Sequence, residues 1–161
     1  MIVHSPLDRA AETARIIAGE LTPNPSVEAD PELTEATFSR YLQGVPYWQV
    51  PIRRPLWVVH KTRRGVVAGD ETIEAMGRRV LSVAGRLSRE HPGETIALVS
   101  HADPLNAARI LIEGRPHNER EMHRSGIQKA GMLQVDVDGE TPTAWEYIPA
   151  PNVGKTAPAA A

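Results

Sequence analysis

The hydrophobic pattern of the chain predicts short strands that are followed directly by helices. Residues 96–99 form an apolar run without polar alternation, which is typical of a strand covered on both faces in a parallel sheet. Asp103 as N-cap and Pro104 at the first helical position then predict a helix that runs to about Glu113. The pattern therefore places His101 between the end of a buried strand and the start of a helix.

The beginning of the chain shows the same kind of transition. A short strand over residues 1–3 is followed by Ser5 as N-cap and Pro6 in the first turn of a helix. Apolar residues then recur at helical spacing and predict the buried stripe, which comprises Leu7, Ala10, Ala14, Ile17 and Leu21. Arg9 consequently lies in the first turn of this helix.

The most regular helical pattern lies between residues 70 and 91. Its inward stripe is predicted to comprise Ile73, Met76, Val80, Val83, Ala84 and Leu87. Outside this helix the patterns predict an extended piece at 26–30, a polar helix or loop at 117–125, a strand with one solvated face at 133–137, and a returning strand around Trp145 and Tyr147.

Two stretches of the chain lack a regular pattern. Residues 36–69 are broken by prolines and are predicted to be an insertion that lies over the sheet edge or the site. The basic residues of this stretch belong either to a lid over an anionic substrate or to an ordinary solvated loop. They include Arg53, Arg54, Lys61, Arg63 and Arg64. Residues 149–161 are rich in proline and alanine and are predicted to be a mobile tail.

Alternating strands and helices predict an α/β fold, a three-layer sandwich with a mostly parallel central sheet flanked by helices. The 161 residues suit one domain, over residues 1–148. In such sheets ligands bind beyond the carboxyl ends of strands, where helix N-termini favour anions. His101 is therefore a candidate for holding a phosphate or carboxylate, the alternative being a histidine that only bonds to a loop.

Composition narrows the class of protein. The formal net charge of −2 offers no general attraction for nucleic acid or an anionic membrane. The absence of cysteine excludes disulfides and thiolate chemistry, and the other histidines lack metal-ligand spacing, so no metal site is expected. No apolar stretch is long enough to span a bilayer and the N-terminus lacks signal-peptide features, so a cytoplasmic protein is expected.

Three segments together resemble a known family. The string from Ser5 to Ala14, Ser-Pro-Leu-Asp-Arg-Ala-Ala-Glu-Thr-Ala, resembles the second motif of the histidine phosphatase superfamily, which includes the cofactor-dependent phosphoglycerate mutases. Residues 33–35 resemble its proton-donor segment, and residues 99–103 resemble its second-histidine motif. The resemblance runs in order from residue 1 to about 147, and it implies a phosphoglycerate mutase-like fold.

The resemblance also implies roles for individual residues. Arg9 would be a phosphate ligand, Glu35 the general acid and His101 the second phosphate-binding histidine, with Ser5 and Ala102 also at the substrate. Such roles are chemically sensible, because phosphoryl transfer needs donors around three charged oxygens and a proton for the leaving group. Considered alone, Arg9 and Glu35 have the alternative of being ordinary solvated surface residues.

One feature of the superfamily is missing from the sequence. Its members begin with a strand ending in Arg-His-Gly, whose histidine accepts the phosphoryl group, and this sequence contains no Arg-His-Gly. The chain as given is therefore expected to be truncated and inactive; His4 is the nearest substitute, but its position matches a small polar residue of the family. In the superfamily this strand lies beside the one that corresponds to residues 96–99, so unpaired backbone groups and self-association are expected there.

Two functions remain open at this stage. One is a phosphomonoester phosphatase or phosphomutase, acting on a small phosphorylated metabolite or a phosphoprotein. The other is a non-catalytic phosphoryl-binding pseudoenzyme or regulatory module. Neither implies a cofactor, a nucleic-acid partner or a membrane.

Overall fold

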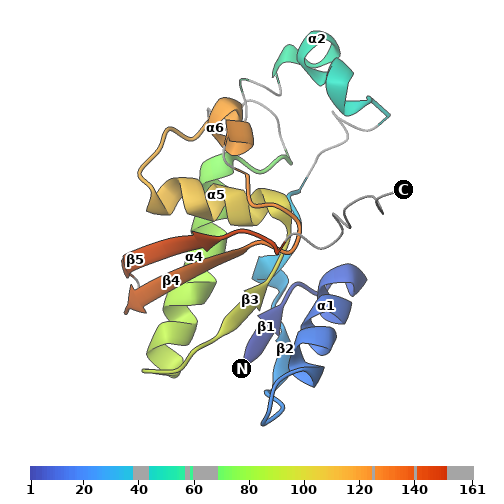
Figure 1. The fold of residues 1–161 in the computed structure, drawn as a ribbon. Helices are drawn as coiled ribbons and strands as arrows, with labels where there is room; N and C mark the ends of the chain where they lie inside the picture. Colours follow the sequence, from blue (N-terminus) through green and yellow to red (C-terminus); the bar gives the residue numbers. More distant parts are fainter. Residues whose placement is uncertain (38–43, 57–58, 60–68, 125, 140, 152–161) are drawn as a thin grey trace, which may run out of the picture.

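Two separate sheets and the helices around them make up the computed structural model, which describes residues 1–37, 44–56, 59, 69–124, 126–139 and 141–151 (Figure 1). The first sheet is parallel and has the strand order β2-β1-β3. Its strands are β1 (Ile2–His4), β2 (Val27–Ala29) and β3 (Ala97–Val99). The two strands predicted at residues 1–3 and 96–99 are therefore neighbours in one sheet.

Helices cover both faces of the parallel sheet, as Figure 1 shows. α1 (Asp8–Gly19) lies on one face, where Ile2 packs against Ala14 and Ala18. α4 (Ile73–Glu90) and α5 (Ala102–Ile112) lie on the other, where Val3 packs in a cluster with Val80. Successive strand residues point to opposite faces, which is why neighbouring residues join different clusters. The predicted α/β class, with a parallel sheet between helices, is confirmed.

The second sheet is an antiparallel pair, β4 (Met132–Asp138) and β5 (Thr141–Ile148). The predicted solvated face of β4 is confirmed, since exposed and half-buried residues alternate along it. Within the described residues this pair shares no ladder with the parallel sheet. It contacts α4 instead, where the Ser88 hydroxyl donates to the Val137 carbonyl at 3.3 Å.

The first helix differs from its prediction at both ends. It begins at Asp8 with Leu7 as N-cap, so Ser5 lies outside it. Its buried residues are all small and comprise Ala10, Ala11, Ala14 and Ala18. Ile17 is 37% exposed at the flank of this stripe, and Leu21, beyond the helix end, is 48% exposed. Alanines allow α1 to pack closely on the sheet, and the predicted inward role of the two larger residues was wrong.

The other site helix also begins earlier than predicted. The N-cap of α5 is His101 rather than Asp103, and Pro104 lies within the first turn, where its missing N–H costs nothing. Its buried residues include Ala108, whereas the larger Leu105 and Ile112 are only half-buried. β3 is half-buried along its length rather than covered on both faces, because it pairs with β1 on one edge only among the described strands.

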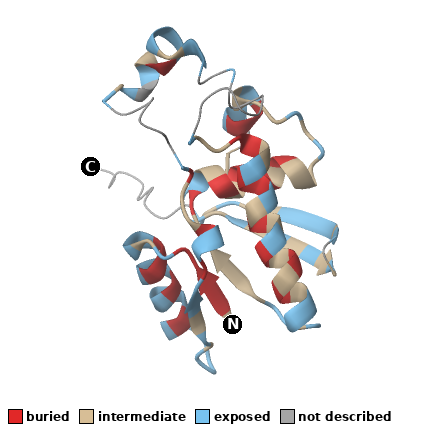
Figure 2. Cartoon of the chain, turned by 180° about the vertical axis from the view of Figure 1, so that it is seen from behind, coloured by how far each residue is buried: buried red, intermediate tan, exposed pale blue. Residues whose placement is uncertain are grey.

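The long helix was predicted most closely. α4 is capped by the Thr72 side chain, which accepts from the Ala75 amide at 3.2 Å. Its predicted stripe is buried except for Ala84, which is half-buried. Figure 2 shows buried residues recurring along this helix, and the stripe packs against the parallel sheet and α5. α6 (Glu119–Arg124) falls within the predicted 117–125 segment.

The predicted insertion is only partly described. Its described part holds two short helical pieces, η2 (Tyr47–Gln49) and α2 (Val50–Arg53). Figures 1 and 2 both place α2 at the end of the molecule away from the N-terminus. Residues 38–43, 57–58 and 60–68 lie outside the described part, with Lys61, Arg63 and Arg64, as do residues 152–161 of the predicted tail. Among the described helices, none has the length and apolar character needed to cross a membrane.

Candidate functional site

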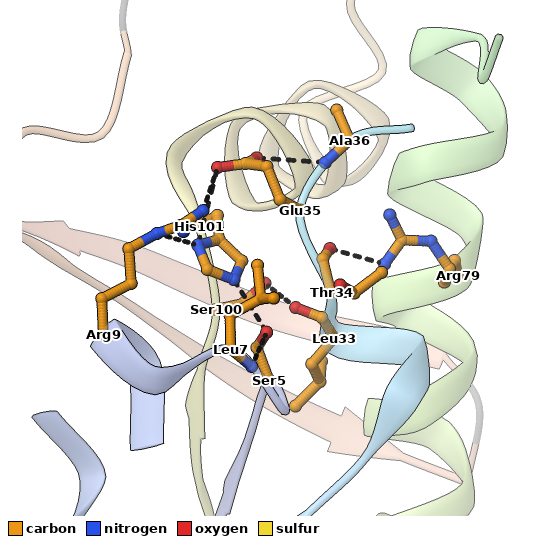
Figure 3. Close-up of polar contacts among 10 residues, drawn as sticks. All are labelled: Ser5, Leu7, Arg9, Leu33, Thr34, Glu35, Ala36, Arg79, Ser100 and His101. Atoms are coloured by element: carbon orange, nitrogen blue, oxygen red, sulfur yellow. Dashed lines mark hydrogen bonds and ion pairs between the residues drawn. The ribbon is translucent and has the colours of Figure 1, made fainter. Parts of the chain in front are cut away.

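The candidate site lies where the carboxyl ends of β1 and β3 meet the first turns of α1 and α5 (Figure 3). Because His4 pairs with Val99 in parallel register, the residues that follow both strands emerge at the same edge. The Ser5 amide donates to the Val99 carbonyl at 2.9 Å, which fixes the two strand ends together. This edge is where the sequence predicted an anion site.

Ser5 and His101 form the buried floor of the site. Their Oγ and Nε2 atoms are 2.8 Å apart, and both residues are almost fully buried. The Ser5 hydroxyl also accepts from the Leu7 amide at 3.3 Å. Ser5 therefore fixes the orientation of the imidazole ring, and in doing so it turns the Nδ1 edge toward Arg9.

Arg9 bonds to both His101 and Glu35. From the first turn of α1 it donates Nε–H to His101 Nδ1 at 3.1 Å and Nη2–H to Glu35 Oε2 at 3.2 Å. Its side chain is 61% exposed, so the guanidinium is accessible to a ligand. An ion pair this exposed contributes only about 0.2–1 kcal/mol to stability. An anionic ligand can therefore replace the Glu35 carboxylate on Arg9 at little cost.

Glu35 follows η1 (Pro31–Leu33), a 3₁₀ turn that buries Leu33 completely. One carboxylate oxygen accepts from the Ala36 amide at 3.1 Å, and the other lies 3.5 Å from His101 Nδ1. The structure thus brings Glu35, Arg9 and His101 together from three distant parts of the sequence.

The surroundings of His101 favour its neutral form. Desolvation by burial lowers the pKa of His101 below its ordinary value of 6.5; Glu35 opposes this, and the positive charges of Arg9 and Arg79 add to it. The hydrogen bonds agree, because a guanidinium can only donate and Nδ1 must then accept. The assigned tautomer therefore carries its proton on Nε2, which donates to Ser5.

The remaining predicted residue, Ala102, has no polar side chain, so its backbone amide is the group that it could offer to an anion. It is the first residue of α5, where amide N–H groups have no acceptor within the helix and the helix dipole favours negative charge. The His4 ring bonds to the backbone and not to Arg9, Glu35 or His101, since its Nδ1 donates to the Ser5 carbonyl at 2.7 Å. In the part of the chain that the structure describes, no group of three His, Asp or Glu side chains is arranged to hold a metal.

Two residues that the sequence did not single out hold the Glu35 segment. The Ser100 hydroxyl donates to the Leu33 carbonyl at 2.7 Å, and the Arg79 guanidinium donates to the carbonyls of Glu32 and Thr34. The only local signal for Arg79 is its place beside the apolar stripe of α4, seven residues before Arg86, which also contacts this segment through Asp30.

Comparisons with known proteins identify the class. The sequence matches the profile of the histidine phosphatase superfamily, branch 1, over residues 1–147. The chain therefore belongs to this superfamily. A search of curated proteins finds no match.

Solved structures share the fold at low sequence identity. YhfR from Bacillus stearothermophilus superposes with a TM-score of 0.72 at 21% identity, covering 88% of this chain and 70% of that protein. A mycobacterial glucosyl-3-phosphoglycerate phosphatase gives 0.67 at 20% identity, covering 93% and 76%. A mutant phosphoserine phosphatase from Entamoeba histolytica, in complex with phosphoserine, gives 0.70 at 16% identity, covering 92% and 73%.

Proposed function

We propose that this site binds the phosphoryl group of a phosphomonoester. The observation that carries the proposal is the bridge that Arg9 makes between His101 and Glu35 at the start of two helices. A phosphate in the place of the Glu35 carboxylate would meet Arg9, the imidazole Nδ1 edge and the first amides of α5. Charge-assisted bonds from Arg9 and the helix amides, and from Nδ1 once the anion has favoured protonation of the ring, suit the three oxygens of a phosphoryl group.

The same arrangement suits proton donation to a leaving group. Glu35 lies beside the oxyanion donors but on a separate segment, so its carboxyl can move from Arg9 to the ester oxygen when phosphate takes the guanidinium. A positioned carboxylic acid of this kind assists the departure of an alkoxide. Glu35 is accordingly the proposed general acid of a phosphatase or phosphomutase reaction.

The proposed substrate class is a small phosphorylated metabolite. The relatives in the previous subsection are named for glucosyl-3-phosphoglycerate and phosphoserine, which are both phosphomonoesters. The sequence holds donors and an acid but no Arg-His-Gly to accept the phosphoryl group. We therefore propose that the chain as given binds phosphate without turnover, which is also how a phosphoryl-binding regulatory module would behave.

Calorimetry with inorganic phosphate tests the binding proposal. Arg9→Ala should weaken binding by about 10- to 100-fold, because a hydrogen bond to a charged group contributes about 1.5–3 kcal/mol. Arg15→Ala is the matched control, since Arg15 is an exposed arginine of α1 that pairs with Glu12 and should leave binding unchanged. Absence of binding by the unaltered chain, or equal binding by Arg9→Ala, would refute the proposal.

Hydrolysis of para-nitrophenyl phosphate tests the absence of turnover. The chain as given should release no nitrophenol above background. If it does, and Arg9→Ala abolishes the release, a residue other than an Arg-His-Gly histidine accepts the phosphoryl group. A matched His4→Ala variant would then show whether His4 is that residue.

A further inference from the structure

The segment before Glu35 is held by three successive backbone carbonyls. The Arg79 Nη1 group donates to the Glu32 and Thr34 carbonyls, the latter at 3.0 Å. The carbonyl between them, of Leu33, accepts from Ser100 at 2.7 Å. Glu32 and Leu33 end the 3₁₀ turn η1 and Thr34 is extended, so bonds from α4 and from the residue after β3 together hold the chain immediately before the acid.

Arg79 is itself firmly placed. Its Nε and Nη2 groups bind the two carboxylate oxygens of Glu71, each at 2.9 Å, and only 12% of its side chain and 16% of that of Glu71 are exposed. Such a bidentate pair has one geometry and orients the remaining N–H groups. The Glu71 amide in turn donates to the Thr37 carbonyl at 3.2 Å. The pair therefore fixes the backbone on both sides of Glu35.

The position of Arg79 on α4 suits this role, and that of its neighbour does not. Arg79 and Arg86 lie seven residues apart, on one flank of the helix, and Arg86 binds Asp30 at 2.5 Å near the start of the same segment. Arg78 lies on a different face, where its side chain is 68% exposed and pairs with Glu74. Arg78 is thus a natural control for Arg79.

We propose that Arg79 is a positioning residue that places the Glu35 carboxylate against Arg9 and His101. This role rests on the proposed function of Glu35. The fully buried side chain of Leu33 anchors the segment in the core. The bonds from Arg79 to the Glu32 and Thr34 carbonyls fix the path of the backbone from Leu33 to Glu35. Arg79 acts through the backbone, because its guanidinium bonds to carbonyls and to Glu71 and not to the Glu35 side chain.

The test is an NMR titration of the His101 imidazole in a double-mutant cycle, without ligand. The charged groups around this ring are Glu35, Arg9 and Arg79, and the Glu35 charge raises the pKa of His101. Glu35→Gln should therefore lower this pKa in the unaltered background. In the Arg79→Ala background the same substitution should have no effect, because Glu35 no longer lies near the ring.

The controls separate positioning from general loss of structure. Glu35→Gln should still lower the pKa of His101 in an Arg78→Ala background, and Arg79→Lys should restore part of the effect. If Arg79→Ala fails to fold, Ser100→Ala supplies the second variant, since it removes the neighbouring carbonyl bond without unpairing Glu71. The role is overturned if Glu35→Gln shifts the titration equally with and without Arg79, or with and without Ser100 where that variant is used.

The cycle also separates this role from the function on which it rests. An unaltered chain that binds no phosphate would refute the proposed function and leave the titration readable. Phosphate binding with equal Glu35→Gln shifts in both backgrounds would refute only the role of Arg79.

Discussion

Arg9 donates its Nε–H to Nδ1 of His101 across 3.1 Å, joining residues that lie 92 positions apart in the chain. The contact requires an unprotonated Nδ1, because a guanidinium has no lone pair to accept with. Protonation of His101 therefore removes this bond and puts two positive charges side by side. The state of one proton thus decides how the resting site is held together.

Acid should destabilise the fold through His101. Burial lowers its pKa below 6.5 in the folded chain, so as the pH falls the unfolded chain takes up the proton first. The contribution of neutral His101 to the free energy of unfolding is fully present above about pH 6.5. It is lost as the pH falls from there through the pKa of His101 in the folded chain. Urea unfolding between about pH 7 and pH 5 measures it, at about 1.4 kcal/mol for each unit of pKa difference. His101→Gln should show a smaller fall in stability over this window; an equal fall would contradict the assignment.

Phosphate should raise the pKa of His101. A bound dianion beside the Nδ1 edge favours the charged imidazolium, which would then donate from both nitrogens. The imidazole resonances should therefore titrate at higher pH with saturating phosphate than without it. Chloride at equal ionic strength is the control, since general screening would act in both salts. An unchanged titration with phosphate bound would place the anion away from His101.

The part of the site predicted from sequence is the part fixed by local rules. Ser5, Arg9 and His101 each stand where a strand ends and a helix begins, and parallel strands bring their carboxyl ends to one edge. The two transitions placed Arg9 and His101 at helix entrances, and the resemblance to the superfamily then assigned both residues to one site. The role of Glu35 came from the resemblance to the superfamily, and the structure places its carboxylate 3.5 Å from His101.

Tertiary contacts decided what the sequence did not predict. The bonds from Arg79 and Ser100 to the Glu35 segment join positions 45 and 67 residues apart, and no local pattern distinguishes Arg79 from Arg78 beforehand. The starts of α1 and α5 shifted by a few residues, because capping preferences allow several starts and backbone geometry selects one. β3 is half-buried because no described strand pairs with its second edge.

Gly77→Ala should destabilise the fold. A Cβ at this position would overlap the Leu111 side chain and lie 2.7 Å from the Ala107 carbonyl oxygen, where α4 crosses α5. The backbone atom cannot move without separating the two helices, so we expect a loss of about 1–3 kcal/mol in urea unfolding.

Gly19→Ala is the control for this prediction. A Cβ on Gly19, at the end of α1, would meet nothing within 4 Å. The substitution should be neutral or stabilising by up to about 1 kcal/mol, because alanine restricts the unfolded chain. Equal effects of the two substitutions would show that α4 and α5 do not pack closely at Gly77.

The open edge of β3 should be a site of self-association. The Ala97 amide donates to the Met1 carbonyl, and the Val99 carbonyl accepts from the Ser5 amide, so both residues bond toward β1. The N–H and C=O of Leu98 then point to the opposite edge, where no described strand pairs with them. Such an edge is a template for another chain.

Hydrogen exchange at several protein concentrations measures this association. In dilute solution the Leu98 amide should exchange faster than the Ala97 amide, which is bonded to β1. At higher concentration the protection of Leu98 should rise together with the sedimentation coefficient, because a second chain would accept its N–H. A monomer in which Leu98 is as protected as Ala97 at every concentration would mean that this edge is already satisfied, and association would have to use another surface.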